Sequence, residues 1–148
     1  MPGEEERGIE DFPVIRSAAT RWSDNDMFGH LNNAAYYALF DSAINGWLTE
    51  ATGIAPLDQP ARGVVAQSSC RFLHEAGFPD DLLIGIGIER LGAKSVTYRL
   101  GLFRDGQPPT LAALGQWVHV YVDPTSRATV PIPAAIRAVL TAADPSAP

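Results

Sequence analysis

One short stretch of this chain gathers polar side chains of the kinds that can do chemistry on a carbonyl group. Residues 21–37, RWSDNDMFGHLNNAAYY, place two acids, several amides and a histidine directly ahead of a long apolar run. The N-terminus of a helix carries unpaired N–H groups and about half a unit of positive charge. Such donors stabilise the oxyanion that forms in acyl transfer. Asp26 stands just ahead of the predicted helix and could attack the carbonyl or activate a water.

The same residues also have a purely structural interpretation. Asp and Asn ahead of a helix are most often turn formers and caps, so an isolated Asp-Asn-Asp favours that role. His30 could equally be a histidine that hydrogen-bonds within the turn, and Tyr36 and Tyr37 are by default core aromatics. The residues by themselves leave both interpretations open.

The elements around this turn are predicted from the periodicity of apolar residues. Residues 13–22 alternate like a strand, and the polar turn covers 23–32. A helix of about five turns follows, with Asn32 or Asn33 as its N-cap and Gly53 where a C-cap belongs. Apolar residues recur around most of this helix, so we expect it to be largely buried. The one narrow polar line on the helix consists of Asp41, Asn45 and Thr49.

The second half of the chain reads as strands joined by turns. Four strands are predicted, at 62–73, 82–91, 94–104 and 111–122, and a short helix follows within 130–143. Because the strands follow one another closely, we expect them to form an antiparallel meander. A lone apolar helix must be covered, and a curved sheet that wraps it does so economically. The predicted fold class is therefore α+β.

The stretch TRWSDNDMFGHLNNAAYYALFD, residues 20–41, closely resembles the opening motif of the hotdog-fold acyl-CoA thioesterases. It is most similar to the 4-hydroxybenzoyl-CoA thioesterase branch, in its subgroup with D-x-D-x-x-G-H-[VL]-N-N. The resemblance extends over roughly residues 13–123 in the order of the elements. The motif is matched at Arg21, Trp22, Asp24, Asp26, Gly29, His30, Leu31, Asn32, Asn33 and Tyr36.

This resemblance implies a fold, an activity and an assembly. The fold is a five-stranded antiparallel sheet around one long central helix, with a short C-terminal helix. The activity is hydrolysis of an acyl-CoA thioester to a carboxylic acid and free coenzyme A, without a metal or redox cofactor. The assembly is a homodimer or homotetramer with sheets joined edge to edge, which would also cover exposed strand edges.

The resemblance also implies roles for the residues of the turn. Asp26 becomes the catalytic carboxylate, as nucleophile or as general base, and backbone N–H groups near Gly29 and His30 polarise the carbonyl. Related branches have a histidine where this chain has Asn33, so Asn33 is expected to orient substrate or water. That difference leaves open whether His30 takes an acid–base role. The residues expected to hold the turn in shape are Arg21, Asp24 and Asn32.

The substrate would then need an apolar surface and a phosphate contact. The acyl group is expected to run along Tyr36, Tyr37 and Phe40, and Arg90 and Lys94, which flank a tight turn, are the predicted phosphate contact. Two alternatives remain: a non-catalytic module that binds acyl-CoA or fatty acid, and a thioesterase for an acyl carrier protein. An acidic carrier prefers a basic docking surface, which the acidic chain does not favour.

The overall totals limit the remaining possibilities. A length of 148 residues suits one domain. We expect a loose acidic tail over 1–11, the domain over 12–143 and a C-terminal tail over 144–148. A net charge of −6 argues against binding nucleic acid. No apolar run approaches the roughly 20 residues that span a bilayer, so no membrane partner is expected.

Cysteine and histidine usage points to a compartment and argues against a metal. The start of the chain lacks the features of a signal peptide, and one cysteine cannot form an internal disulfide, so the cytoplasm is the expected location. The three histidines have no ligand spacing, so no metal site is expected. Cys70 is expected to be a small buried group. Its predicted neighbours on one strand face are Val64, Ala66, Ser68 and Phe72.

Overall fold

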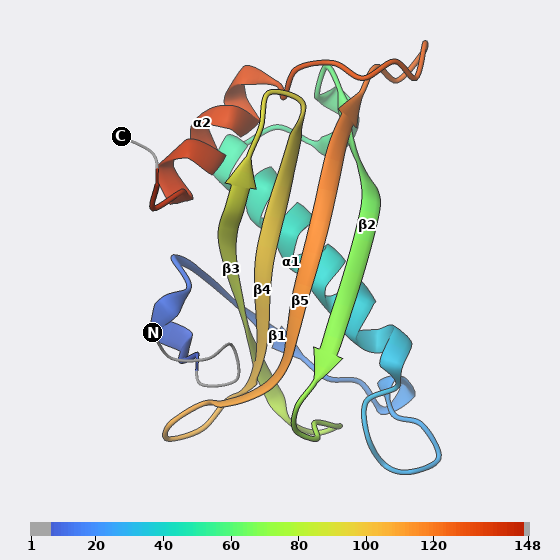
Figure 1. Ribbon diagram of the computed structural model, residues 1–148. Coiled ribbons are helices and arrows are strands. Elements are labelled where there is room, and N and C mark those ends of the chain that lie inside the picture. The colour runs from blue at the N-terminus through green and yellow to red at the C-terminus, as the bar shows by residue number, and fades with distance from the viewer. Residues whose placement is uncertain (1–6, 147–148) are drawn as a thin grey trace.

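The computed structural model describes residues 7–146 and contains seven regular elements (Figure 1). They are β1 (Val14–Ala19), α1 (Asn33–Thr52), β2 (Arg62–Phe72), β3 (Asp81–Leu91), β4 (Ser95–Arg104), β5 (Thr110–Val122) and α2 (Ala134–Ala143). Single 3-10 turns lie at Ile9–Asp11, Trp22–Asp24 and Pro56–Asp58. Of the two predicted tails, residues 1–6, 147 and 148 lie outside the described residues.

The strands form one five-stranded antiparallel sheet in the order β1-β3-β4-β5-β2. Helix α1 crosses one face of this sheet diagonally, so that its N-terminal end lies beside the C-terminal end of β2 (Figure 1). The core between helix and sheet is apolar and includes Phe40, Ile44, Ile86, Leu100 and Trp117. The α+β hotdog prediction is confirmed.

The predicted meander of four strands is wrong in one place. Only β3, β4 and β5 form a meander, whereas β2 pairs with β5 at the edge opposite β1. The eight residues 73–80 can span about 26 Å when extended. The positions of β2 and β3 are three strand spacings apart, which is about 14 Å. The connection is therefore long enough to carry the chain from one edge past two strands.

Helix α1 begins and ends as its capping residues predict. The Asn32 side chain accepts a hydrogen bond from the N–H of Ala34 at 2.9 Å, and Gly53 adopts φ 69° at the C-cap. The prediction of a largely buried helix is wrong, because a single sheet covers only one side of it. Tyr36, Phe40, Ile44 and Trp47 are among the buried residues. The exposed face carries Ala34, Ala38, Asp41, Ser42 and Asn45.

Strand β2 is an edge strand whose side chains are mostly exposed. A bulge between Val65 and Gln67 shifts the register of β2 against β5. Val64 and Ala66, which precede or form this bulge, therefore do not share a strand face with Cys70, and that part of the prediction is wrong. Cys70 itself is partly buried, and burial raises the pKa of its thiol to about 11. An exposed edge that carries apolar residues is a surface that proteins usually cover.

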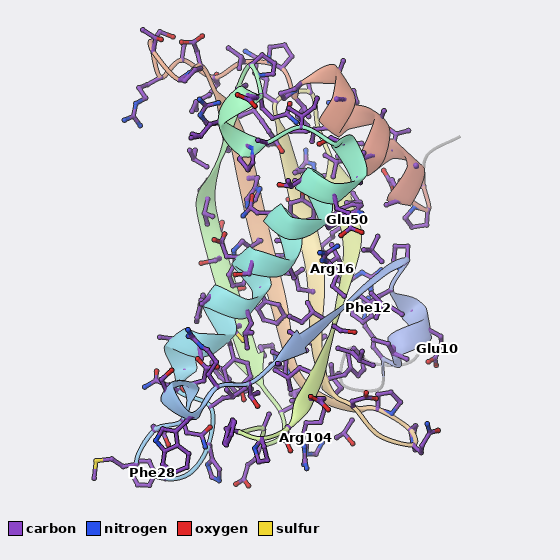
Figure 2. The ribbon with its side chains drawn as sticks, turned by 180° about the vertical axis from the view of Figure 1, so that it is seen from behind. Glu10, Phe12, Arg16, Phe28, Glu50 and Arg104 are labelled. Carbon is purple, nitrogen blue, oxygen red and sulfur yellow. The ribbon has the colours of Figure 1, made fainter. Side chains whose placement is uncertain are left out.

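The N-terminal segment covers part of the other face of the sheet. Phe12 is buried there against Phe103, at a ring-centroid distance of 5.8 Å, with Leu111 and Leu114 in the same cluster. On the helix side, Arg16 of β1 pairs with Glu50 of α1 at 3.1 Å (Figure 2). Both faces of the sheet are therefore tied to flanking segments, and β1 and β2 are its two edge strands.

Candidate active site

The turn ahead of α1 is held in shape by Asp24. Its carboxylate is buried and accepts hydrogen bonds from the backbone N–H of Arg21 at 2.8 Å and from the guanidinium of Arg21 at 2.8 and 3.2 Å. The Arg21 side chain lowers the pKa of Asp24 below its ordinary value. The carbonyl oxygen of Asp24 in turn accepts from the N–H of Asn32 at 2.8 Å. Arg21, Asp24 and Asn32 thus form the frame of the turn.

Asp26 lies inside this frame, at a partly buried position. Its Oδ1 accepts hydrogen bonds from the N–H of Phe28 at 2.9 Å and, more weakly, from the N–H of His30 at 3.5 Å. The backbone N–H of Gly29 donates to the carbonyl oxygen of Asp26 at 3.2 Å, with Gly29 at φ 80°. The turn therefore fixes one carboxylate oxygen of Asp26.

The positive end of α1 lies at Asn33, four residues after Gly29 and three after His30, where the polarising N–H groups were expected. Helix α1 begins at Asn33, and the N–H of Ala34 is already bonded to the capping side chain of Asn32. The N–H of Gly29 is used within the turn. The first helical N–H, that of Asn33, is accordingly the donor at the positive end of the helix dipole.

The segment that follows β2 forms a second wall beside the turn. The N–H of Leu31 donates to the carbonyl oxygen of Ala76 at 2.7 Å, and the N–H of Phe78 donates to Oδ1 of Asn25 at 2.9 Å. A Cβ at Gly77 would come within 2.8 Å of the carbonyl oxygen of Gly29, so glycine permits the close approach. These contacts bring two distant parts of the sequence together.

A shallow pocket of about 280 Å³ lies between the turn, the helix end and this second wall. Tyr36 stands edge-on to Phe72 at 5.0 Å between ring centroids. Burial, with a smaller effect of Cys70 and Asp26, raises the pKa of the Tyr36 hydroxyl. Nε2 of His30 lies 3.3 Å from a carboxylate oxygen of Glu75. The pocket is lined by Asp26, His30, Leu31, Asn33, Tyr36, Phe72, Leu73, His74 and Glu75.

Four predicted substrate residues lie away from this pocket. Tyr37 is partly buried against Trp117, and Phe40 is fully buried against the same ring. Arg90, near the end of β3, and Lys94, in the following turn, lie at the opposite end of the sheet from the Asp26 turn (Figure 1). One chain therefore brings together Asp26, the helix end and Tyr36, but not the predicted phosphate contact.

The outer side of the turn is apolar and exposed. Met27 is 100% exposed and Phe28 83% exposed, and Figure 2 shows Phe28 at the tip of the loop, away from the body of the chain. Trp22 is also exposed and stands edge-on to Phe78 at 6.0 Å. Apolar side chains so exposed around a pocket are characteristic of an interaction surface.

Sequence reasoning missed the wall from Leu73 to Glu75. The sequence places Leu73 at the end of a predicted strand and gives His74 and Glu75 no role in the site. Their place in the site depends on the backbone hydrogen bond between Leu31 and Ala76, which no local sequence pattern predicts. Within residues 7–146, no three acidic, histidine or cysteine side chains gather as a metal site would need. None of the helices in that range has the length and apolar character to cross a membrane.

The antiparallel sheet packs against the long helix α1, and the carboxylate of Asp26 is fixed beside the N-terminus of that helix. This combination defines a hotdog protein of the thioesterase type. Residues 20–140 match the model of the Thioesterase-like superfamily, and the chain belongs to that superfamily. The PA5185 protein of Pseudomonas aeruginosa is 39% identical, with a TM-score of 0.88 over 95% of this chain and 98% of that one.

Two further relatives are more distant. The BH1999 gentisyl-coenzyme A thioesterase is 23% identical, with a TM-score of 0.74 over 86% of this chain and 99% of that one. This second likeness concerns the fold. Among curated proteins, the uncharacterised YsmA of Bacillus subtilis is 27% identical over 98 residues, which is 66% of each chain.

Proposed function

We propose that this protein is an acyl-CoA thioesterase of the D-x-D-x-x-G-H-[VL]-N-N subgroup. The observation that carries the proposal is the shared pocket of the Asp26 carboxylate and the first N–H group of α1, at Asn33. Membership of the Thioesterase-like superfamily supports the reaction. The name of BH1999, a coenzyme A thioesterase with the same fold, supports coenzyme A as the carrier.

The chemistry follows from what each group can do. The Asn33 N–H, at the positive end of the helix, stabilises the oxyanion as the thioester carbonyl is attacked. One oxygen of Asp26 is fixed by the Phe28 N–H, and the other is left for the reaction. Asp26 either adds to the carbonyl, giving an anhydride that water then opens, or takes a proton from an attacking water. In both routes the C–S bond breaks and coenzyme A leaves as its thiol.

Other residues of the pocket bind and orient. The side chain of Asn33 orients substrate or water, and the Tyr36 ring supplies apolar surface for the acyl group. We also propose an acid–base role for the imidazole of His30, which the contact of its Nε2 with Glu75 at 3.3 Å would support. The single cysteine keeps the cytoplasm as the predicted location.

We infer that the protein acts as a homodimer, or as a tetramer built from such dimers, through strand β2. This edge strand has 11 residues and exposed apolar side chains at Val64, Val65 and Phe72. Pairing with a second copy would satisfy its free backbone groups and cover these side chains. Arg90 and Lys94 lie far from Asp26 of their own chain. They therefore remain predicted phosphate contacts only for an ester that is bound at another subunit.

A thiol-release screen tests the proposed function. Purified protein is given short, long, branched and aryl acyl-CoA esters, together with the same acyl groups on an acyl carrier protein. We expect thiol release from at least one coenzyme A ester. Tight binding without release would support the non-catalytic module, and faster release from the carrier protein would support the second alternative.

A further inference from the structure

A second pocket lies on the face of the sheet that points away from α1, and the chemistry above does not use it. Its volume is about 190 Å³, which is well above what a single water needs. The floor consists of Leu114 and Gly115 of β5, and Leu114 belongs to the apolar cluster around Phe12 on this face. The polar residues that line the pocket are Arg7, Ser69, Arg71, Glu89, Arg99 and Gln116.

Glycines in β3 and β4 make room for the side chains that lie on this face. Gly87 of β3 is opposite Arg99 of β4, and a Cβ at Gly87 would come within 2.7 Å of Nη2 of Arg99. A Cβ at Gly85 or Gly101 would overlap the ring of Phe12. Glycine in a strand interior often marks such a close approach. The guanidinium of Arg99 and the ring of Phe12 can therefore lie flat against the sheet.

Contacts with the N-terminal segment hold the Arg99 side chain in place. Its Cζ lies 4.8 Å from the centroid of the Phe12 ring, and its Nη2 donates to the carbonyl oxygen of Asp11 at 3.2 Å. Burial lowers the pKa of Arg99, and the charge of Arg7 lowers it further, against smaller opposing effects of Asp11 and Glu89. The positive charge of Arg99 is thus fixed at a partly buried place where its acidic neighbours compensate it incompletely.

The charges around the pocket are unevenly matched. Among the described residues that line it, the positive groups are the guanidinium groups of Arg7, Arg71 and Arg99, and the negative group is the carboxylate of Glu89. Glu89 accepts a hydrogen bond from Nε2 of Gln116 at 2.6 Å. The chain as a whole has a formal net charge of −6, so this excess of positive charge is local. Like charges that are brought together repel, and the arrangement therefore favours an anion between them.

The positive groups reach the pocket from different segments. Arg71 lies on β2, Arg99 lies two strands away on β4, and Arg7 precedes the segment that crosses the sheet. Ser69 of β2 is opposite Gln116 of β5, which is opposite Arg99, so the row continues across the sheet. A guanidinium binds carboxylate and phosphate alike. A phosphate group presents oxygens in several directions, so it suits donors that converge from several sides better than a carboxylate does.

We propose that this pocket binds a small phosphate-type anion between the guanidinium groups of Arg7, Arg71 and Arg99. The hydroxyl of Ser69 supplies a further donor. The pocket is smaller than the roughly 300 Å³ at which sites for drug-sized ligands begin, so it suits phosphate or pyrophosphate. It lies on the opposite face of the sheet from α1, so its ligand is a free anion and not the substrate at Asp26.

Titration calorimetry of the full chain with inorganic pyrophosphate and with phosphate tests the site, at an ionic strength held constant with sodium chloride. We expect saturable binding. Arg71→Gln and Arg99→Gln should each weaken the binding, raising Kd at least about 10-fold, the factor that one charge-assisted hydrogen bond represents. Arg127→Gln, which removes an exposed arginine outside the pocket, is the matched control and should leave Kd unchanged.

Urea unfolding curves separate loss of binding from loss of structure. Arg99 also holds the N-terminal segment through Phe12 and Asp11, so Arg99→Gln is expected to lower the free energy of unfolding as well. Arg71 is exposed, so its replacement should leave the unfolding curve close to that of wild type. The result for Arg71→Gln therefore decides the test by itself.

Three results would overturn the inference. The first is the absence of saturable binding of both pyrophosphate and phosphate to the wild-type chain. The second is an unchanged Kd in the folded Arg71→Gln variant. The third is binding of malonate, a dicarboxylate, as tight as that of pyrophosphate.

A kinetic measurement distinguishes a free anion from the phosphate groups of coenzyme A. Pyrophosphate is added to the thiol-release assay with the best acyl-CoA ester. A free-anion site predicts that pyrophosphate does not compete with the ester and that Arg71→Gln leaves KM for the ester unchanged. Competitive inhibition, together with a KM that rises in Arg71→Gln by the same factor as Kd, would assign the pocket to the substrate and overturn the separate site, while the proposed function would stand.

Discussion

Replacing Asp24 with asparagine should destabilise the protein through the turn that carries Asp26. The carboxylate of Asp24 is buried, and its Oδ2 accepts from the backbone N–H of Arg21 at 2.8 Å. In Asp24→Asn, an amide NH₂ replaces one of the two oxygens. Either the backbone N–H or the guanidinium of Arg21 then faces another donor instead of an acceptor.

The size of the effect follows from which bond is protected from water. The Arg21 side chain is 76% exposed, so its ion pair with Asp24 is screened by water and contributes little to stability. A hydrogen bond to a charged acceptor is worth about 1.5–3 kcal/mol, so loss of the bond to the backbone N–H should cost about 2 kcal/mol. For a chain of this length that corresponds to a fall in Tm of about 6 °C.

Urea unfolding followed by circular dichroism measures this free energy, with the exposed Asp58→Asn as the matched control. The pKa of Asp24 is lower in the folded state, so its contribution is complete above the ordinary carboxyl pKa of 3.8 and is lost as the pH falls through the folded value. The difference between wild type and Asp24→Asn should therefore shrink in acid. A loss below about 0.5 kcal/mol at pH 7, the range of ordinary surface changes, would refute the reasoning.

Three further predictions concern the same region and the edge strand. Gly29→Ala should cost about 1 kcal/mol in urea unfolding, because φ is 80° while nothing lies within 4 Å of the added Cβ; unchanged stability would contradict it. Asn32→Ala should cost about 1 kcal/mol by the same assay through loss of the N-cap, whereas the exposed Asn33→Ala should cost less. With a pKa of about 11, Cys70 should react with iodoacetamide at pH 8 at least about 100-fold more slowly than a free cysteine, and faster as the pH rises; equal rates would contradict the burial of the thiol.

The sequence was most informative where the signal is local. Asn32 and Gly53 mark the ends of α1 because capping depends on neighbouring backbone groups. Strands β3, β4 and β5 lie within one residue of their predicted limits, because turn residues and alternation fix them. The resemblance in the motif then supplied the hotdog arrangement.

What the sequence did not predict depends on contacts between distant segments. Strand β2 pairs with β5, which lies far from it in the sequence, so its place in the sheet depends on which sheet edge the chain meets after α1. The bulge in β2 likewise depends on the register with β5. The exposed face of α1 reflects a sheet that covers one side only. The wall around Glu75 joins the site through a hydrogen bond from Leu31 to Ala76, 45 positions apart.

The central claim is that the carboxylate of Asp26, beside the N-terminus of α1, hydrolyses a coenzyme A thioester. The most direct measurement is kcat/KM for the best ester of the screen, in wild type and in Asp26→Asn, with unfolding curves to confirm that both are folded. Loss of a nucleophile or general base predicts a fall of at least about 100-fold. A folded Asp26→Asn variant that keeps the wild-type rate would contradict the claim.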